Sequence, residues 1–152
     1  MVDKELLSRK ISGLREYISE LRKSADITWE KYQSDVRSKA FVERYLHLAT
    51  ELVLDIGNHI IAFHQWREPA GYRDIFLVLN EHGIINHNEL NIYQKMASFR
   101  NMLVHRYEKI EDEVVFGIFQ RNLKDFDTFI LRIREWADRH AEGHLGEDNE
   151  LQ

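Results

Sequence analysis

The chain is organised around one stretch, Ser98-Phe99-Arg100-Asn101-Met102-Leu103-Val104-His105-Arg106-Tyr107. It combines five side chains that can bind or react with a ligand with the apolar run 102–104. A fully solvated helix would not carry that apolar run, and a fully buried helix would not carry so many polar groups. We therefore expect a helix that buries one side in the core and presents the other side to a functional site.

Apolar residues recur at helical spacing along most of the 152-residue chain. The spacing predicts helices over 3–23, 36–65 and 72–81, a helix from Asn86 into the motif, and a last helix from Asp112 through Trp136. One short helical turn is expected near Trp29. A single proline and seven glycines leave little material for the turns of a β-protein. The predicted fold class is all-α, an up-and-down bundle of four to five main helices.

Two features refine this prediction of the fold. Gly57 lies inside the long helix predicted over 36–65, and the close approach of another helix explains a glycine there better than a break does. Residues 141–152 contain four acids and neither lysine nor arginine, so they are expected to form a disordered acidic tail. A single helical domain is expected over residues 1–140.

Charge and composition limit the kinds of partner. The net charge of −5 argues against a general nucleic-acid coat, yet residues 95–109 carry four Lys or Arg against one acid. One basic strip on an acidic protein fits a local RNA contact. The chain has no cysteine, and no apolar run approaches the roughly 18 residues of a membrane span. We expect a cytoplasmic protein without a membrane segment.

The motif also carries a family resemblance. Arg100, four further residues and then His105 through Tyr107 spell R-x4-H-x-Y, with Asn101 directly after the arginine. This pattern resembles the signature of the HEPN ribonuclease superfamily, and the block 99–107 is similar to the HepT toxins, over roughly residues 3 to 140. HepT toxins are paired with an antitoxin that is a minimal nucleotidyltransferase, MNT. The resemblance implies a HEPN-like homodimer with its active-site cleft at or near the interface.

The motif residues suit the cleavage of RNA, which carries its own nucleophile in the 2′-hydroxyl. His105 can act as base or acid, because an ordinary histidine titrates near cellular pH. Arg100 suits the phosphate through its fixed, charged donors. Asn101 could orient the imidazole or donate to a phosphate oxygen, and Arg106 would help to bind the RNA phosphate.

Geometry limits how these groups can meet. At about 100° per residue, Arg100 and His105 would lie about 140° apart around one ideal helix. They can converge through the long reach of the arginine, through a distorted helix end near His105, or through a two-fold dimer that brings two motifs to one cleft. The dimer also supplies two histidines, whereas a single one cannot be acid and base at once.

Tyr107 has three interpretations: an aromatic at the edge of the core, a platform on which an RNA base stacks, or the acceptor of a modification. The HepT resemblance implies the third. In that family the MNT partner transfers AMP from ATP to the motif tyrosine. Such a group adds bulk and negative charge where an RNA phosphate must lie, so it would inhibit by blockage and repulsion.

Asp55 and Asn58 are polar residues within the apolar run 52–61. Buried polar groups need partners, so the two could orient Arg100 or His105 from a neighbouring helix. Alternatively, they could mark an exposed edge of their own helix. The sequence leaves these two interpretations equal.

Other sites are absent from the sequence. There is no phosphate-binding loop and no G-x-G-x-x-G, so no cofactor is expected. His59/His64 and His82/His87 have a spacing of five, which does not place two imidazoles on one helix face, so no metal site is expected.

Two functional hypotheses follow from the residues and the resemblance. The first is a metal-independent RNA endonuclease, the toxin of a type VII-like toxin–antitoxin pair, which acts on RNA, with tRNA as one candidate, and is neutralised when a cognate MNT antitoxin AMPylates Tyr107. The alternative is a catalytically inactive HEPN module that binds a nucleotide or a partner protein. The intact set of Arg100, Asn101, His105 and Tyr107 favours the first.

Overall fold

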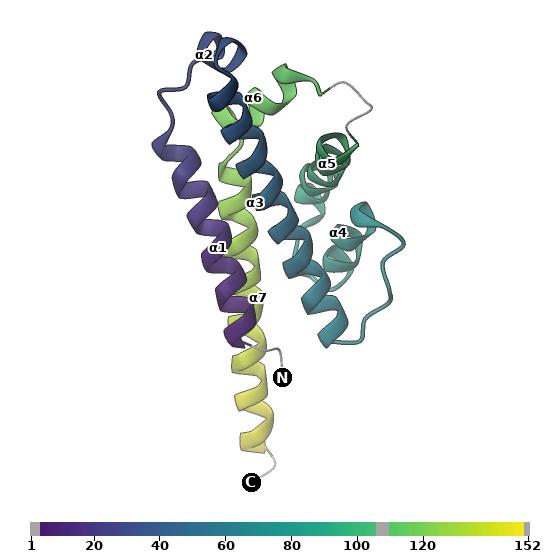
Figure 1. The fold of residues 1–152 in the computed structure, drawn as a ribbon. Coiled ribbons are helices and arrows are strands. Elements are labelled where there is room, and N and C mark those ends of the chain that lie inside the picture. Colours follow the sequence, from purple (N-terminus) through teal and green to yellow (C-terminus); the bar gives the residue numbers. More distant parts are fainter. Residues whose placement is uncertain (1–3, 106–109, 151–152) are drawn as a thin grey trace.

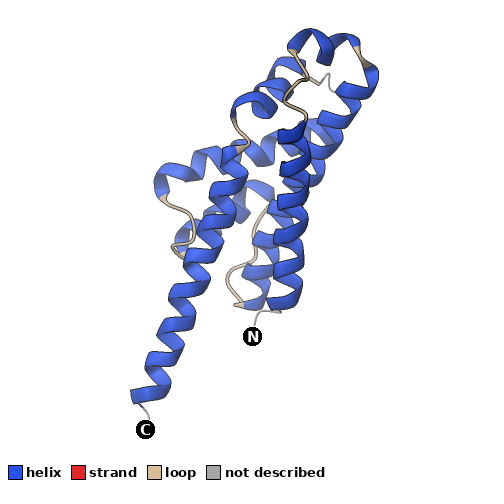
Figure 2. Cartoon of the chain, turned by 90° about the vertical axis from the view of Figure 1, so that its left-hand side faces the viewer, coloured by secondary structure: helices blue, strands red, loops and turns tan. Residues whose placement is uncertain are grey.

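The computed structural model describes residues 4–105 and 110–150, with the side chains of 4–105 and 110–140. Within these residues all regular secondary structure is helical (Figure 2). The helices are α1 (Lys4–Lys23), α2 (Trp29–Ser34), α3 (Val36–Phe63), α4 (Tyr72–Glu81), α5 (His87–Val104), α6 (Asp112–Arg121) and α7 (Lys124–Glu150). The all-α prediction is confirmed, and α1, α3, α5 and α7 are the long helices of the bundle.

Helix α3 is the central element of the bundle. It packs against α1 and α7 on one side and against α4 and α5 on the other (Figure 1). Its buried side chains recur every three or four residues, which is why a single helix can contact so many neighbours. They include Val42, Leu46, Ala49, Val53, Ile56 and Ile60. The helix begins after Asp35, whose carboxylate accepts a hydrogen bond from the Arg37 N–H at 3.3 Å.

Gly57 lies where α4 packs closely on α3. A Cβ atom at this position would lie 2.7 Å from Ile75 Cγ2 and 3.3 Å from Leu79 Cδ1. The close approach expected at Gly57 is therefore confirmed. The predicted bounds of α4 are confirmed as well, and Gly83 follows the helix with a φ of 78°, a left-handed conformation that favours glycine. This packing fixes α4 against α3 and sets the position of Tyr72, its first residue.

Replacing Gly57 with alanine is expected to lower the free energy of unfolding by about 1–3 kcal/mol, because the added methyl group overpacks the contact with Ile75. Gly13→Ala is the matched control. It also lies inside a helix, but its Cβ would meet Leu52 Cδ1 at an ordinary 3.4 Å, so the gain in helix propensity, up to about 1 kcal/mol, should dominate. Urea denaturation measures both variants, and equal stabilisation of the two would contradict the close approach.

The C-terminal helical segment differs from the prediction. The sequence predicts one helix from Asp112 through Trp136, but the structure divides it into α6 and α7 at Asn122 and Leu123. The Asn122 N–H still bonds to the Ile118 carbonyl at 2.9 Å, after which the Asn122 carbonyl accepts from the Asp125 N–H at 3.1 Å. Asparagine is a weak helix former that suits such a helix end. The break redirects the chain, so that α7 packs against α1 and α3.

Helix α7 continues through 141–150, the segment for which the sequence predicts a disordered acidic tail, and it extends beyond the rest of the bundle (Figure 1). The division of the chain at residue 140 stays a prediction. Among the described residues, no helix combines the length and the apolar character that crossing a membrane requires.

Candidate active site

The motif lies at the C-terminal end of α5. Asn86 and Glu89 form a capping box at the start of this helix, as the sequence predicts, and the helix ends at Val104. His105 is the C-cap residue: its N–H bonds to the Asn101 carbonyl at 3.0 Å, and its ψ of 81° turns the backbone away from the helix. The exposed His105 therefore departs from ideal helical geometry. A distorted helix end of this kind is one of the expected ways to bring His105 close to Arg100.

Arg100 points from α5 toward α3 and is held by three neighbours. Its Nε donates to Glu51 Oε1 at 2.6 Å, and its Nη1 donates to Asn101 Oδ1 at 3.3 Å. Its Cζ lies 4.4 Å from the centroid of the Tyr72 ring, within the range of a cation–π contact. Only 16% of the side chain is exposed. The guanidinium is thus fixed in orientation before any ligand arrives.

Glu51 is the functional residue that sequence reasoning missed. The oxygen that accepts from Arg100 also lies 3.3 Å from His47 Nε2, one helical turn earlier on α3. The Glu51 side chain is 39% exposed, so the pair with Arg100 is partly desolvated. A usable signal existed in the sequence, since Glu51 lies four residues before Asp55 on the same face of the predicted long helix.

Tyr72 is held by an ion-pair network that closes the connection between α3 and α4. Arg67 donates to Asp74 at 2.7 and 2.9 Å and to Glu81 at 2.9 Å, and the Ala70 N–H donates to Asp74 at 2.8 Å. Hydrogen bonds from Arg67 lower the pKa of the Asp74 carboxyl to about 2. This network anchors the first turn of α4 and with it the ring that supports Arg100.

Asp55 and Asn58 lie on the exposed side of α3. The Asp55 carboxylate pairs with Lys10 of α1, and it is 56% exposed. Arg100 pairs with the Glu51 carboxylate, so the structure does not support the interpretation in which Asp55 orients Arg100. The alternative interpretation, an exposed edge of the helix, describes where both residues lie. Asp55 does not reach Arg100 because α5 contacts α3 at the level of Glu51, one helical turn before Asp55.

Two predicted site residues, Arg106 and Tyr107, lie outside the described residues. Of the remaining candidates, the structure brings together Arg100 and Asn101 by a hydrogen bond and links Asn101 to His105 through the backbone. In the described part of the chain, no group of three or more histidine or carboxylate side chains is placed to hold a metal ion.

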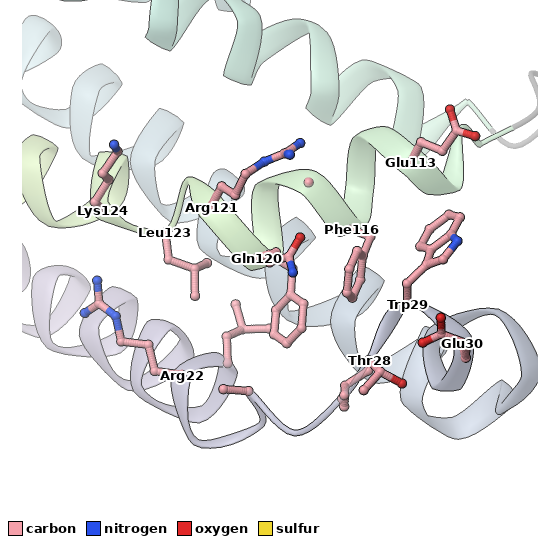
Figure 3. A pocket seen from close by; sticks show the side chains of 15 residues that line it. Arg22, Thr28, Trp29, Glu30, Glu113, Phe116, Gln120, Arg121, Leu123 and Lys124 are labelled. Carbon is pink, nitrogen blue, oxygen red and sulfur yellow. The ribbon is translucent and has the colours of Figure 1, made fainter.

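A pocket of about 780 Å³ opens between the end of α1, α2 and α6 (Figure 3). Trp29 and Phe116 line it, with ring centroids 5.4 Å apart, and so does Arg22, which pairs with Asp127. None of the predicted site residues lines this pocket. We therefore assign the candidate active site to the network around Arg100.

Known proteins resemble this chain in both sequence and fold. A family model described as "Ribonuclease HepT-like" matches residues 14–133. The chain is 30% identical over 100 residues to the mRNA nuclease HepT of Shewanella oneidensis, which covers 66% of this chain and 75% of that protein. It is 22% identical over 135 residues to the tRNA nuclease HepT of Aphanizomenon flos-aquae, covering 89% of this chain and 92% of that protein.

A solved structure has the same fold over most of its length. It contains the tri-AMPylated HEPN toxin of Shewanella oneidensis in complex with an MNT antitoxin. The toxin matches with a TM-score of 0.79 and 27% identity, covering 89% of this chain and 99% of that chain. The helical bundle and the R-x4-H motif at the end of α5 define a protein of the HEPN class. Within that class, the chain belongs to the HepT-like ribonuclease family.

Proposed function

We propose that the protein is the ribonuclease toxin of a toxin–antitoxin pair and that Arg100 and His105 form its metal-independent RNA-cleaving centre. The observation that carries the proposal is the anchoring of Arg100 by Glu51 and Tyr72, one turn from the helix end that presents His105. The names of two relatives, an mRNA nuclease and a tRNA nuclease, support RNA cleavage as the class of reaction.

The proposed reaction uses the 2′-hydroxyl of RNA as the nucleophile. One His105 imidazole accepts its proton while the 2′-oxygen attacks the adjacent phosphorus, and a protonated imidazole donates a proton to the departing 5′-oxygen. The products are a 2′,3′-cyclic phosphate and a 5′-hydroxyl. Arg100 has one N–H committed to Glu51 and one to Asn101, so further donors on its Nη atoms remain for two phosphate oxygens.

A homodimer is part of this proposal, because one reaction needs a base and an acid at the same moment. A two-fold axis near the end of α5 would bring two His105 side chains, and two Arg100 side chains, into one cleft. The exposed end of α5 supports such an arrangement, since Val104 is 37% exposed beside His105.

Mixing native and variant subunits tests the shared centre and the nuclease activity together. A His105→Ala homodimer should be nearly inactive on RNA. A heterodimer of one native and one His105→Ala subunit keeps a single imidazole, so it lacks either the acid or the base and should be nearly as inactive as the variant homodimer. If that heterodimer instead keeps about half of the activity of a native dimer, each centre lies within one chain.

The antitoxin would act at Tyr107. An MNT nucleotidyltransferase would transfer AMP from ATP to the tyrosine hydroxyl and release pyrophosphate, leaving a phosphodiester with one negative charge beside the motif arginines. The solved toxin–antitoxin complex that resembles this chain supports the proposal, since its toxin is tri-AMPylated. The added phosphate would compete with RNA phosphate for Arg100.

Tyr107→Phe should fold, keep a ring at the motif, and gain no AMP when incubated with the cognate antitoxin, ATP and magnesium. The reason is the loss of the only atom at that position that can accept AMP. Intact-mass spectrometry measures the modification, with Tyr45→Phe on α3 as the control that should be modified like the native protein. Equal mass gains on Tyr107→Phe and on the native protein would move the modification to another residue.

A further inference from the structure

A second pocket lies directly beside the Arg100 network. It has a volume of about 460 Å³ and opens between α1, α3 and the start of α4. Glu51 and Tyr72, the two residues that fix Arg100 from α3 and α4, belong to its lining. A ligand in this pocket would therefore be a near neighbour of any phosphate that Arg100 binds.

Two walls of the pocket can hold a flat ring. Tyr72 is 38% exposed and stands at the pocket with the Arg100 guanidinium over its ring. Tyr17 of α1 lines the pocket too, and its ring is braced edge-on by Tyr45 at a centroid distance of 5.5 Å. Leu48 and Leu52 supply apolar contacts. Aromatic side chains of this kind stack with nucleobases of single-stranded RNA.

The pocket is also lined by Asp55 and Asn58, two polar residues that take no part in the Arg100 network. The exposed Asp55 carboxylate has one oxygen on Lys10 and keeps acceptor capacity on the other. The Asn58 side chain lies one turn further along α3 and has no hydrogen bond to any described residue. Lys10 offsets the charge of Asp55, which reduces its repulsion of an RNA phosphate.

We propose that this pocket is the base-binding subsite of the RNA substrate and that it prefers guanine. The Watson–Crick edge of guanine carries two adjacent donors, N1–H and the N2 amino group, which a carboxylate accepts together, and the O6 acceptor, which an amide N–H reaches. Adenine and cytosine offer one amino donor beside an acceptor, and uracil offers one donor between two acceptors. Asp55 would bind the two guanine donors and Asn58 would bind O6. The inference rests on the proposed function for the identity of the ligand as RNA.

The test is a binding measurement that does not depend on cleavage. The probes are 2′-O-methyl tetranucleotides of uridine with a single guanine, adenine or cytosine, which lack the nucleophile and stay intact. Isothermal titration of the native protein should give at least about tenfold tighter binding of the guanine probe, the scale of one bidentate base contact. Asp55→Asn should reduce that preference to below about threefold, and Asn58→Leu should reduce it less.

Asp26→Asn is the matched control, because Asp26 is also an exposed aspartate near a lysine, with Lys31 Nζ 3.9 Å away, and does not line the pocket. It should keep the full preference. A native protein without base preference, or an Asp55→Asn variant that keeps it while folded by circular dichroism, would overturn the subsite. The side-chain amide signals of Asn58 in NMR spectra give a second readout, since the guanine probe should shift them and the adenine probe should not.

The proposed nuclease reaction and the proposed guanine subsite can be rejected independently of each other. RNA cleavage with no preference for guanine next to the cut would leave the nuclease intact and remove the subsite. A guanine preference in binding, together with no cleavage of any RNA, would keep the subsite and reject the proposed reaction.

Discussion

Replacing His105 with alanine is expected to lower the rate of RNA cleavage by about 10² to 10⁴-fold, the usual contribution of a general acid or base. The helix bond from His105 to Asn101 uses only the backbone, so the variant should keep this end of α5. Single-turnover cleavage of a labelled RNA measures the rate. His87→Ala, at the exposed start of the same helix, is the control and should cleave at the native rate.

Arg100→Ala should give a loss in the same range, since it removes the positive charge that faces the phosphate in the transition state. Its fold needs a separate check, because the guanidinium also packs on Tyr72 and pairs with Glu51. A variant that unfolds at a clearly lower temperature than His105→Ala would indicate that the ion pair is mainly structural. A stable, inactive variant would support the catalytic role.

Glu51→Ala is expected to lower kcat/KM by about 10- to 100-fold, because a hydrogen bond between charged groups contributes about 1.5–3 kcal/mol to the placement of its partner. Glu51→Gln keeps an acceptor for the Arg100 Nε–H and should lose less activity. The loss should fall mainly on kcat, since Arg100 would still attract RNA but would hold the phosphate less well.

A positioning role for Glu51 has its own signature. The Arg100 Nε–H signal should be visible in NMR spectra of the native protein and should broaden or shift in Glu51→Ala, because its 2.6 Å hydrogen bond is gone. Glu135→Gln is the control, since Glu135 also pairs with an arginine, Arg132, but on exposed α7 surface. An unchanged kcat in Glu51→Ala would show that Arg100 needs no anchor.

The sequence predicts the helices well where periodicity and capping agree. The start of α3, the bounds of α4, the capping box of α5 and the tight contact at Gly57 each follow from local rules, because side-chain spacing and cap chemistry act within a few residues. The break at Asn122 escapes those rules. Apolar residues continue with helical spacing across it, so one weak helix former predicts no break, and the packing of α7 against α1 and α3 selects two helices over one.

The sequence identified the motif residues of the candidate site but not the residue that pairs with Arg100. Arg100, Asn101 and His105 lie close in sequence, so a motif can find them. Glu51 is 49 residues from Arg100 and contacts it only because α5 crosses α3 at one particular turn. Periodicity fixes which face of α3 points inward but not the level at which another helix crosses. That is why the sequence suggests the neighbouring Asp55, in one of its two interpretations, for the contact that Glu51 makes.

We propose that Arg100 and His105 cleave RNA with the 2′-hydroxyl as nucleophile. The most direct measurement is digestion of a defined RNA by the purified protein in excess EDTA, with analysis of both new ends by mass spectrometry. We expect cleavage at the same rate as without EDTA and fragments that end in a 2′,3′-cyclic phosphate and begin with a 5′-hydroxyl. Cleavage that stops in EDTA and returns with magnesium, or fragments that begin with a 5′-phosphate, would contradict it.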